Sequence, residues 1–179
     1  MELHLIRHTT PAIDKGICYG QSDIPLENTF TVEFNRILEN IPSGTEIIYS
    51  SPLTRCSQLA CALGAQLNLP VVHDHRIMEL NFGDWEMNQW DKIDQSVLMH
   101  WMENYVSIPC PNGESYRDLA LRVKTFLSDI AIQNYTSAII VSHAGTIRAI
   151  YSAILELPLE ESFDLKIEYG GYVHLRLRK

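Results

Sequence analysis

Two apolar segments of this chain end abruptly in basic residues, and they constrain its fold more than any other feature. Residues 3–6 precede Arg7 and His8, and residues 138–142 precede His143. Short apolar runs of this kind are typical of buried strands. In open α/β sheets the ligand site lies at the carboxyl ends of the strands. We therefore expect both histidines at the same edge of one sheet.

Strand-like and helix-like patterns alternate along the rest of the chain. The sequence predicts strands near residues 2–7, 46–50, 70–73, 138–142 and 172–177. It predicts helices near residues 31–40, 53–67, 96–105, 114–132 and 146–156. Such alternation predicts an α/β fold, a three-layer α/β/α sandwich with a mostly parallel central sheet. We expect one domain over residues 1–179.

Charge and composition exclude several classes of partner. The formal net charge is −8, from 14 Lys and Arg against 22 Asp and Glu, which argues against nucleic-acid binding. We see neither a signal-peptide pattern nor an apolar run near the roughly 20 residues that span a bilayer, so we expect no membrane partner. The four cysteines lack C-x-x-C spacing, and we expect a reducing, cytoplasmic location. The alternating segment at 172–177 predicts an edge strand, through which a homodimer is conceivable.

Polar residues follow three of the predicted strands and define a candidate site. Arg7 and His8 follow the first strand, Arg55 lies near the start of the helix after the second, and His143 precedes another helix. Helix starts contribute unpaired N–H groups and a positive dipole end. Two arginines and two histidines beside them favour a compact dianion, because the planar guanidinium matches phosphate oxygens. The sequence therefore predicts a site for a small phosphate ester.

The same residues predict what happens to the phosphate. A neutral imidazole is a competent nucleophile toward phosphorus, and arginines neutralise the charge that shifts during transfer. The leaving oxygen then needs a proton, which a carboxylic acid in the crevice could supply. Glu79 is the candidate, while its neighbour Glu86 more simply orders the loop. No carboxylate cluster indicates Mg²⁺, and we expect neither a metal nor another cofactor.

Two further groups of residues have alternative interpretations. His73 and His75 could bind a metal, although such a pair is more often a polar strand face. The segment 85–102 is rich in tryptophan and methionine. It is either core packing or an apolar lid over the flat part of a substrate.

Four motifs in this order resemble the histidine phosphatase superfamily, also called phosphoglycerate mutase-like. They are Leu5-Ile6-Arg7-His8, Ser50-Ser51-Pro52-Leu53-Thr54-Arg55, Glu79-Leu80-Asn81-Phe82-Gly83-Asp84-Trp85-Glu86 and Val141-Ser142-His143-Ala144-Gly145. The resemblance spans nearly the whole chain. It implies that His8 is the phosphorylated nucleophile and that Glu79 donates the proton and later activates water. It also implies that Arg7, Arg55 and His143 clamp the phosphate.

A finer resemblance is to the alpha-ribazole phosphatase family. It is carried by Arg7-His8-Thr9-Thr10-Pro11, Gly16-Ile17-Cys18-Tyr19-Gly20-Gln21-Ser22-Asp23, Phe82-Gly83-Asp84-Trp85-Glu86-Met87 and Pro111-Asn112-Gly113-Glu114-Ser115. This implies removal of the 5′-phosphate from alpha-ribazole phosphate in cobalamin assembly, with Tyr19, Gln21 and Trp85 at the substrate. The chain departs from the superfamily pattern at Thr9, where glycine is common. It also departs at Asp14, where many relatives carry a phosphate-binding asparagine.

Other functions remain open at this stage. A sugar-phosphate or broad-specificity phosphatase would carry the same motifs. A phosphoglycerate mutase-like phosphotransferase would share them but usually has longer insertions over the site, for which 179 residues leave little room. A non-catalytic module that binds phosphate esters would be expected to lack the nucleophile or the acid, and both are present here.

Overall fold

The computed structural model describes residues 1–178, so Lys179, the last residue of the expected domain, lies outside the described part. Its five-stranded sheet has the order β3-β2-β4-β1-β5. The strands are β1 (Glu2–Arg7), β2 (Ile47–Ser50), β3 (Val71–His73), β4 (Ser137–Ser142) and β5 (Tyr172–Arg176). The first four are parallel, and β5 pairs antiparallel with β1 at one edge. This confirms the mostly parallel sheet.

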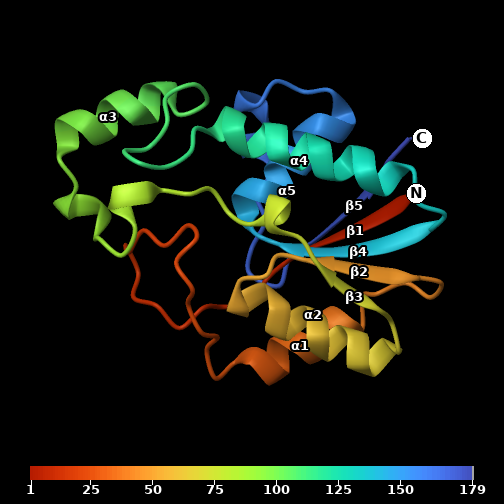
Figure 1. Ribbon diagram of the computed structural model, residues 1–179. Coiled ribbons are helices and arrows are strands. Elements are labelled where there is room, and N and C mark those ends of the chain that lie inside the picture. The colour runs from red at the N-terminus through yellow and green to blue at the C-terminus, as the bar shows by residue number, and fades with distance from the viewer. Residues whose placement is uncertain (179) are drawn as a thin grey trace.

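Helices cover both faces of the sheet (Figure 1). On one face lie α1 (Phe30–Leu38) and α2 (Thr54–Leu67), and on the other lie α4 (Tyr116–Ala131) and α5 (Ala144–Leu155). α3 (Gln95–Asn104) lies away from the sheet, on the side toward which β1, β2 and β4 run. Short 3₁₀ helices are η1 (His75–Ile77), η2 (Gly83–Trp85), η3 (Trp90–Lys92) and η4 (Glu160–Asp164). The three-layer sandwich is confirmed.

The central strands are apolar on both faces because each face is covered. Leu3 and Leu5 of β1 belong to the core cluster beneath α4 and α5, whereas Ile6 belongs to the cluster with α1 and α2. In β4, Ala138 and Ile140 join the first cluster, while Ile139 and Val141 join the second. A parallel strand between two helical layers therefore has a continuous apolar sequence, and this is the pattern from which the strands were predicted.

Side-chain hydrogen bonds fix where two helices begin, one from within the helix and one from a distant segment. Ser115 and Asp118 form a reciprocal capping box at the start of α4. At α2, the Thr54 amide donates to Asp23 Oδ1 at 2.7 Å and the Thr54 hydroxyl donates to Oδ2 at 2.6 Å. This contact ties the long loop after β1 to the helix that carries Arg55. The polar loop is thereby held over the sheet edge.

One turn depends on the absence of a side chain. Gly83 has φ +56°, and a Cβ built there would lie 2.0 Å from the carbonyl oxygen of Pro111. Glycine is the residue that tolerates both conditions. The turn after Glu79 can therefore pack directly against the loop before α4.

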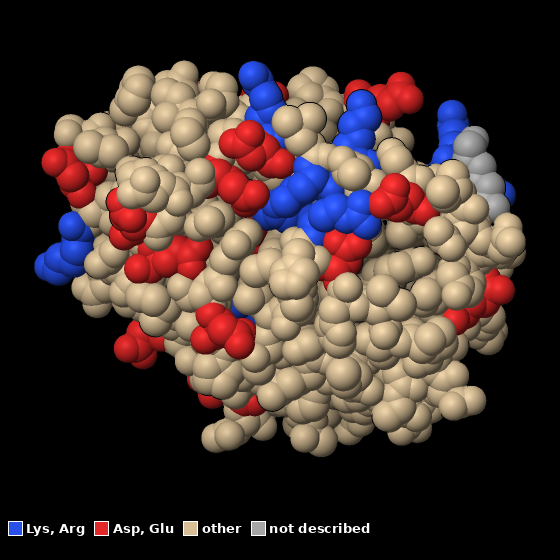
Figure 2. Space-filling model, in the orientation of Figure 1, with Lys and Arg blue, Asp and Glu red and all other residues tan. Residues whose placement is uncertain are grey.

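Charges of both signs are mixed on the surface. On the face drawn in Figure 2, Lys and Arg side chains gather over α4 with Asp and Glu side chains around them. Arg76 pairs with Asp74 at 2.7 Å and with Asp129 at 2.5 Å, and Arg122 pairs with Glu114 at 2.9 Å. In the described part of the chain, no helix is both long enough and apolar enough to cross a bilayer.

Candidate active site

The carboxyl ends of β2, β4 and β1 are neighbours in the sheet, and the predicted site residues meet there. They line a pocket of about 170 Å³. Its walls include Arg7, His8, Tyr19, Arg55, Glu79 and His143. The expectation that both histidines lie at one edge of the sheet is met, since their ring centroids are 5.2 Å apart.

The ring of His8 is held with one nitrogen free of hydrogen bonds. His8 is 2% exposed, and its Nδ1 lies 2.7 Å from the carbonyl oxygen of Thr9. Burial, and then the charge of Arg55, hold the pKa of His8 well below its ordinary value, so the ring is neutral. A carbonyl only accepts, so Nδ1 carries the hydrogen and Nε2 carries the lone pair. No partner for Nε2 is found among residues 1–178.

The ring of His143 has both nitrogens engaged. Arg55 Nε donates to Nδ1 at 3.3 Å, so the hydrogen resides on Nε2, which lies 2.8 Å from Ser51 Oγ. Burial and the nearby Arg55 also hold the pKa of His143 well below its ordinary value. His143 thus lies beside His8. To form a hydrogen bond with a phosphate, a ring nitrogen of His143 must first give up its hydrogen bond to Ser51 or to Arg55.

Two guanidinium groups bring positive charge to the pocket. Arg55 is fully buried, and its Nη1 and Nη2 donate to the carbonyl oxygens of Ser22 at 2.8 Å and Gly20 at 2.6 Å. Arg7 donates to the carbonyl of Ile167 at 2.8 Å. Neither arginine forms an ion pair within residues 1–178. Buried charges are usually paired, so this site favours an anionic ligand.

Two buried polar atoms beside His8 have no protein partner. Arg7 Nε and Thr9 Oγ1 are buried, and neither is hydrogen-bonded in the described part of the chain. Most buried polar atoms in folded proteins are satisfied, and an exception calls for an explanation such as a bound ligand. Both atoms belong to the residues that flank His8, and of these two residues Arg7 lines the pocket.

The carboxylate of Glu79 lies at the N-terminus of α5. Its Oε2 accepts from the Gly145 amide at 3.1 Å, and its Oε1 accepts from the Thr146 amide at 3.2 Å. These amides are among the unpaired N–H groups with which every helix begins. Glu79 therefore caps the helix that follows His143 and also lines the pocket.

The three residues expected to contact substrate have different positions. Tyr19 lines the pocket, and its hydroxyl lies 2.7 Å from that of Tyr169. Gln21 instead donates from Nε2 to the main-chain carbonyl of Glu79 at 3.0 Å, so it holds the loop. Trp85 does not line this pocket. It is 6% exposed and packs in a core cluster with Cys18 and other residues.

Other expectations near the site resolve clearly. Glu86 accepts from the amides of Gln21, Ser22 and Phe82, which confirms that it orders the loop. Asp14 lines a different surface hollow. Within the tryptophan- and methionine-rich segment, Trp85 is core, whereas Trp101 and Met102 line a second pocket.

Tyr169 is a site residue that sequence reasoning missed. The Arg7 guanidinium carbon lies 3.9 Å from the centre of its ring, and the His8 ring lies 5.5 Å away. The residue comes from the irregular segment before β5, where the only sequence signal is the Gly170-Gly171 turn that follows. Its ring covers the guanidinium of Arg7.

A second, larger pocket of about 340 Å³ adjoins the first, and Glu79 and Phe82 line both. Its walls come from α3, α4, α5 and η4 and are largely aromatic: Trp101, Tyr105, Tyr116 and Phe163. Arg148 also lines it and donates from Nε to the carbonyl of Leu165 at 3.0 Å. The space beside Glu79 is thus apolar with one cation.

The low pKa of both site histidines predicts an acid-sensitive fold. The unfolded chain binds a proton at each with an ordinary pKa near 6.5, whereas the folded chain does not. Below pH 6.5 the unfolding free energy should fall by about 1.4 kcal/mol per histidine per pH unit, until the folded-state pKa is reached. The free energy of unfolding, measured by urea titration at about pH 7.5, 6 and 5, tests this prediction. The His8→Ala variant should show a smaller slope, and an unchanged slope would contradict the account.

Neutral histidines, unpaired arginines and a carboxylate at one sheet edge define a phosphate-handling site, and the comparisons identify its family. The sequence profile of the Histidine phosphatase superfamily (branch 1) matches residues 3–179. The chain therefore belongs to the histidine phosphatase superfamily, and it is a phosphatase of that superfamily.

Two curated relatives are similar over most of their length. A protein named Putative phosphoserine phosphatase 2, from Hydrogenobacter thermophilus, is 29% identical over 98% of this chain and 89% of its own. The Adenosylcobalamin/alpha-ribazole phosphatase of Escherichia coli K12 is 26% identical over 95% of this chain and 87% of its own. The crystal structure of the alpha-ribazole phosphatase from Shigella flexneri superposes with a TM-score of 0.91, at 23% identity, over 100% of this chain and 92% of that one. This likeness establishes the fold.

Proposed function

We propose that the protein is a metal-independent phosphomonoesterase that works through a phosphohistidine at His8. The observation that carries the proposal is the state of that ring. Its Nδ1–H is committed to the Thr9 carbonyl, so the lone pair of Nε2 faces a pocket with two unpaired guanidinium groups. A neutral imidazole held in one tautomer is a ready nucleophile.

The proposed reaction has two steps. Nε2 of His8 attacks phosphorus, the ester P–O bond breaks, and the leaving oxygen takes a proton from the Glu79 carboxyl. Water then attacks the phosphohistidine, gives a proton to the Glu79 carboxylate, and breaks the P–N bond, so both side chains return to their starting states. Arg7 and Arg55 neutralise the equatorial oxygens in both steps.

Alpha-ribazole 5′-phosphate, an intermediate of cobalamin assembly, is the substrate that we propose. Support comes from the curated relative named for it and from the second pocket. The pocket begins at Glu79, which is where the leaving alcohol must lie, and Trp101, Tyr105 and Phe163 give it aromatic walls. Aromatic walls suit a flat heterocycle, which they can contact face or edge on.

Phosphoserine is a second candidate, and Arg148 is the observation that favours it. The Arg148 guanidinium lines the same pocket and has no ion pair among residues 1–178. A carboxylate on the alcohol would supply that pair. The relative named Putative phosphoserine phosphatase 2 also supports this candidate.

The experiment compares kcat/KM for alpha-ribazole phosphate, phosphoserine and 3-phosphoglycerate, in EDTA, for the wild type and two variants. We expect alpha-ribazole phosphate to be preferred, and Phe163→Ala to raise its KM more than Arg148→Gln does. Preference for phosphoserine, with the larger loss in Arg148→Gln, would replace the first substrate by the second. Hydrolysis that needs an added divalent metal would contradict the mechanism.

A further inference from the structure

The carboxyl group of Glu79 is carried by a segment without regular structure. Residues 79–82 lie between η1 and η2 and belong to no helix or strand. Within residues 1–178, the side chain is hydrogen-bonded at the start of α5, by the Gly145 and Thr146 amides and the Thr146 hydroxyl, and by the amide of Leu80. To reach a leaving oxygen it must give up part of that cap. The position of its main chain then decides where the carboxyl lies.

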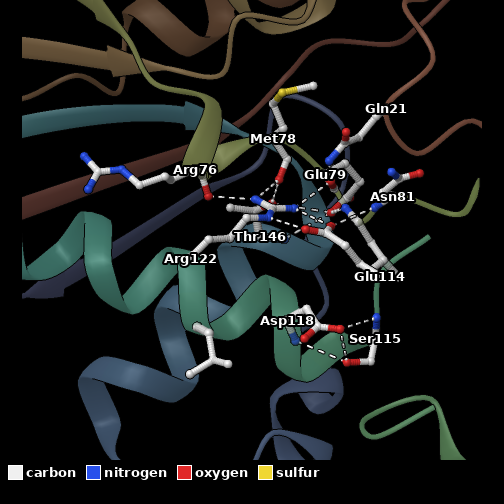
Figure 3. A network of polar contacts seen from close by, with 12 residues as sticks. Gln21, Arg76, Met78, Glu79, Asn81, Glu114, Ser115, Asp118, Arg122 and Thr146 are labelled. Atoms are coloured by element: carbon white, nitrogen blue, oxygen red, sulfur yellow. Dashed lines mark hydrogen bonds and ion pairs between the residues drawn. The ribbon is translucent and has the colours of Figure 1, made fainter. Parts of the chain in front are cut away.

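Arg122 of α4 holds that main chain with three of its five donors. Its Nη1 donates to the carbonyl oxygens of Arg76 and Met78, both at 2.7 Å, and its Nη2 donates to that of Glu79 at 2.8 Å. The Nε and the second Nη2 hydrogen go to the carboxylate of Glu114, at 2.9 and 3.0 Å. A guanidinium has five N–H donors, so every one is used. Figure 3 shows Arg122 at the centre of this network.

Glu114 holds the segment on the other side of Glu79. Its Oε2 accepts from the Asn81 amide at 3.0 Å, and its own amide donates to the Asn81 carbonyl at 2.8 Å. Gln21, from the loop after β1, also donates to the Glu79 carbonyl. The chain is therefore fixed both before and after the residue that carries the acid (Figure 3).

The anchor itself is rigid. Glu114 immediately precedes the capping box of Ser115 and Asp118, and Arg122 lies in the second turn of α4 beyond it. The same helix buries Leu119 and Val123 completely. The side chain of Arg122 is 17% exposed and that of Glu114 is 22% exposed, so solvent screens their charges only weakly.

We propose that Arg122 and Glu114 are positioning residues that set the Glu79 carboxyl against the leaving oxygen of the substrate. The inference rests on the proposed role of Glu79 as the acid. It assigns the control of proton transfer to a helix that does not line the phosphate pocket, while the nucleophile and the phosphate clamp are held by other elements. Loss of the anchor should therefore weaken proton donation, and leave intact both phosphate binding and the phosphorylation of His8 by esters whose leaving group needs no proton.

The test is Arg122→Lys, which keeps the charge but has three donors in place of a planar fork. General acid catalysis is worth roughly 10²- to 10⁴-fold, and small misplacements forfeit much of it. We expect kcat/KM for an alkyl phosphate to fall on the order of tenfold to a hundredfold. For p-nitrophenyl phosphate, whose leaving group needs no proton, we expect a change of less than about threefold. Inhibition by inorganic vanadate should not change.

Arg76→Lys is the matched control. The Arg76 side chain lies in the same region and pairs with Asp74 and Asp129, but its guanidinium does not contact the Glu79 segment. It should slow neither ester. Glu114→Gln is the second variant, in case Arg122→Lys does not fold, and it should show the same contrast between the two esters.

The outcomes separate this inference from the proposed function. Equal slowing of both esters in Arg122→Lys and Glu114→Gln, or the same contrast in Arg76→Lys, overturns the positioning role. If Glu79→Gln discriminates between the esters and the Arg122 and Glu114 variants do not, only the positioning role fails. If Glu79→Gln does not discriminate, the acid assignment fails and the inference falls with it.

Discussion

Replacement of His8 by alanine should abolish turnover of every phosphate ester, with a loss in kcat of at least about 10⁴-fold. The covalent route needs the Nε2 lone pair, and no other side chain in the pocket offers an equivalent nucleophile: His143 has its hydrogen on Nε2 and its Nδ1 bonded to Arg55. The strand should survive, because the His8 amide still donates to Ser142 and the His8 carbonyl still accepts from Gly170. Steady-state kinetics and circular dichroism measure the two halves of this prediction.

His4 supplies the control for that experiment. It is a second buried histidine on β1, at the other end of the strand, where it contacts Tyr172 and Ser137. His4→Gln should retain activity while perturbing the same strand. If His8→Ala keeps more than a small fraction of the wild-type rate with its fold intact, the nucleophile is another group.

Replacement of Glu79 by glutamine should slow hydrolysis in proportion to how poorly the alcohol leaves. Glutamine still accepts a hydrogen bond at the start of α5, so the Gly145 and Thr146 amides need not both lose their partner. What is lost is the transferable proton, which is worth roughly 10²- to 10⁴-fold. We expect a loss of that size for alpha-ribazole phosphate and a much smaller one for p-nitrophenyl phosphate, measured as kcat/KM, which reports the steps up to phosphorylation of His8.

Hydrolysis of the phosphohistidine, the second step, tests the role of Glu79 as the base that activates water. If Glu79 also activates water, the phosphoenzyme formed from p-nitrophenyl phosphate should persist longer in Glu79→Gln and give a burst of p-nitrophenol. Equal losses for both esters, without a burst, would mean that the carboxylate contributes to the structure of α5 and not to proton transfer.

The sheet and the pocket could be predicted from the sequence for one physical reason. Strands covered on both faces must be apolar throughout, so the first polar residues after them mark the sheet edge. That rule located Arg7, His8 and His143, and the register of β1 with β4 confirms it, since Arg7 lies beside Ser142. Arg55 follows similarly, because α2 begins directly after β2.

Other features depend on contacts that leave no periodic signal. Trp85 of η2 and Trp101 of α3 belong to one aromatic-rich segment, and no periodic pattern separates the first, which is core, from the second, which lines a pocket. Tyr169 contacts Arg7 from a segment near the other end of the sequence. In the sequence Arg122 looks like an ordinary helix residue. Its partners are mainly main-chain carbonyls, which every residue type has, so no sequence pattern indicates the contact.

The most direct measurement is the identity of the phosphorylated atom. The enzyme is mixed with a phosphate ester, quenched in alkali within milliseconds to preserve acid-labile phosphohistidine, and mapped by fragmentation and by phosphorus NMR. We predict one phosphoryl group, on Nε2 of His8, because the Thr9 carbonyl holds the hydrogen on Nδ1. A phosphoryl group on Nδ1, on His143 or on a residue other than histidine would contradict the account.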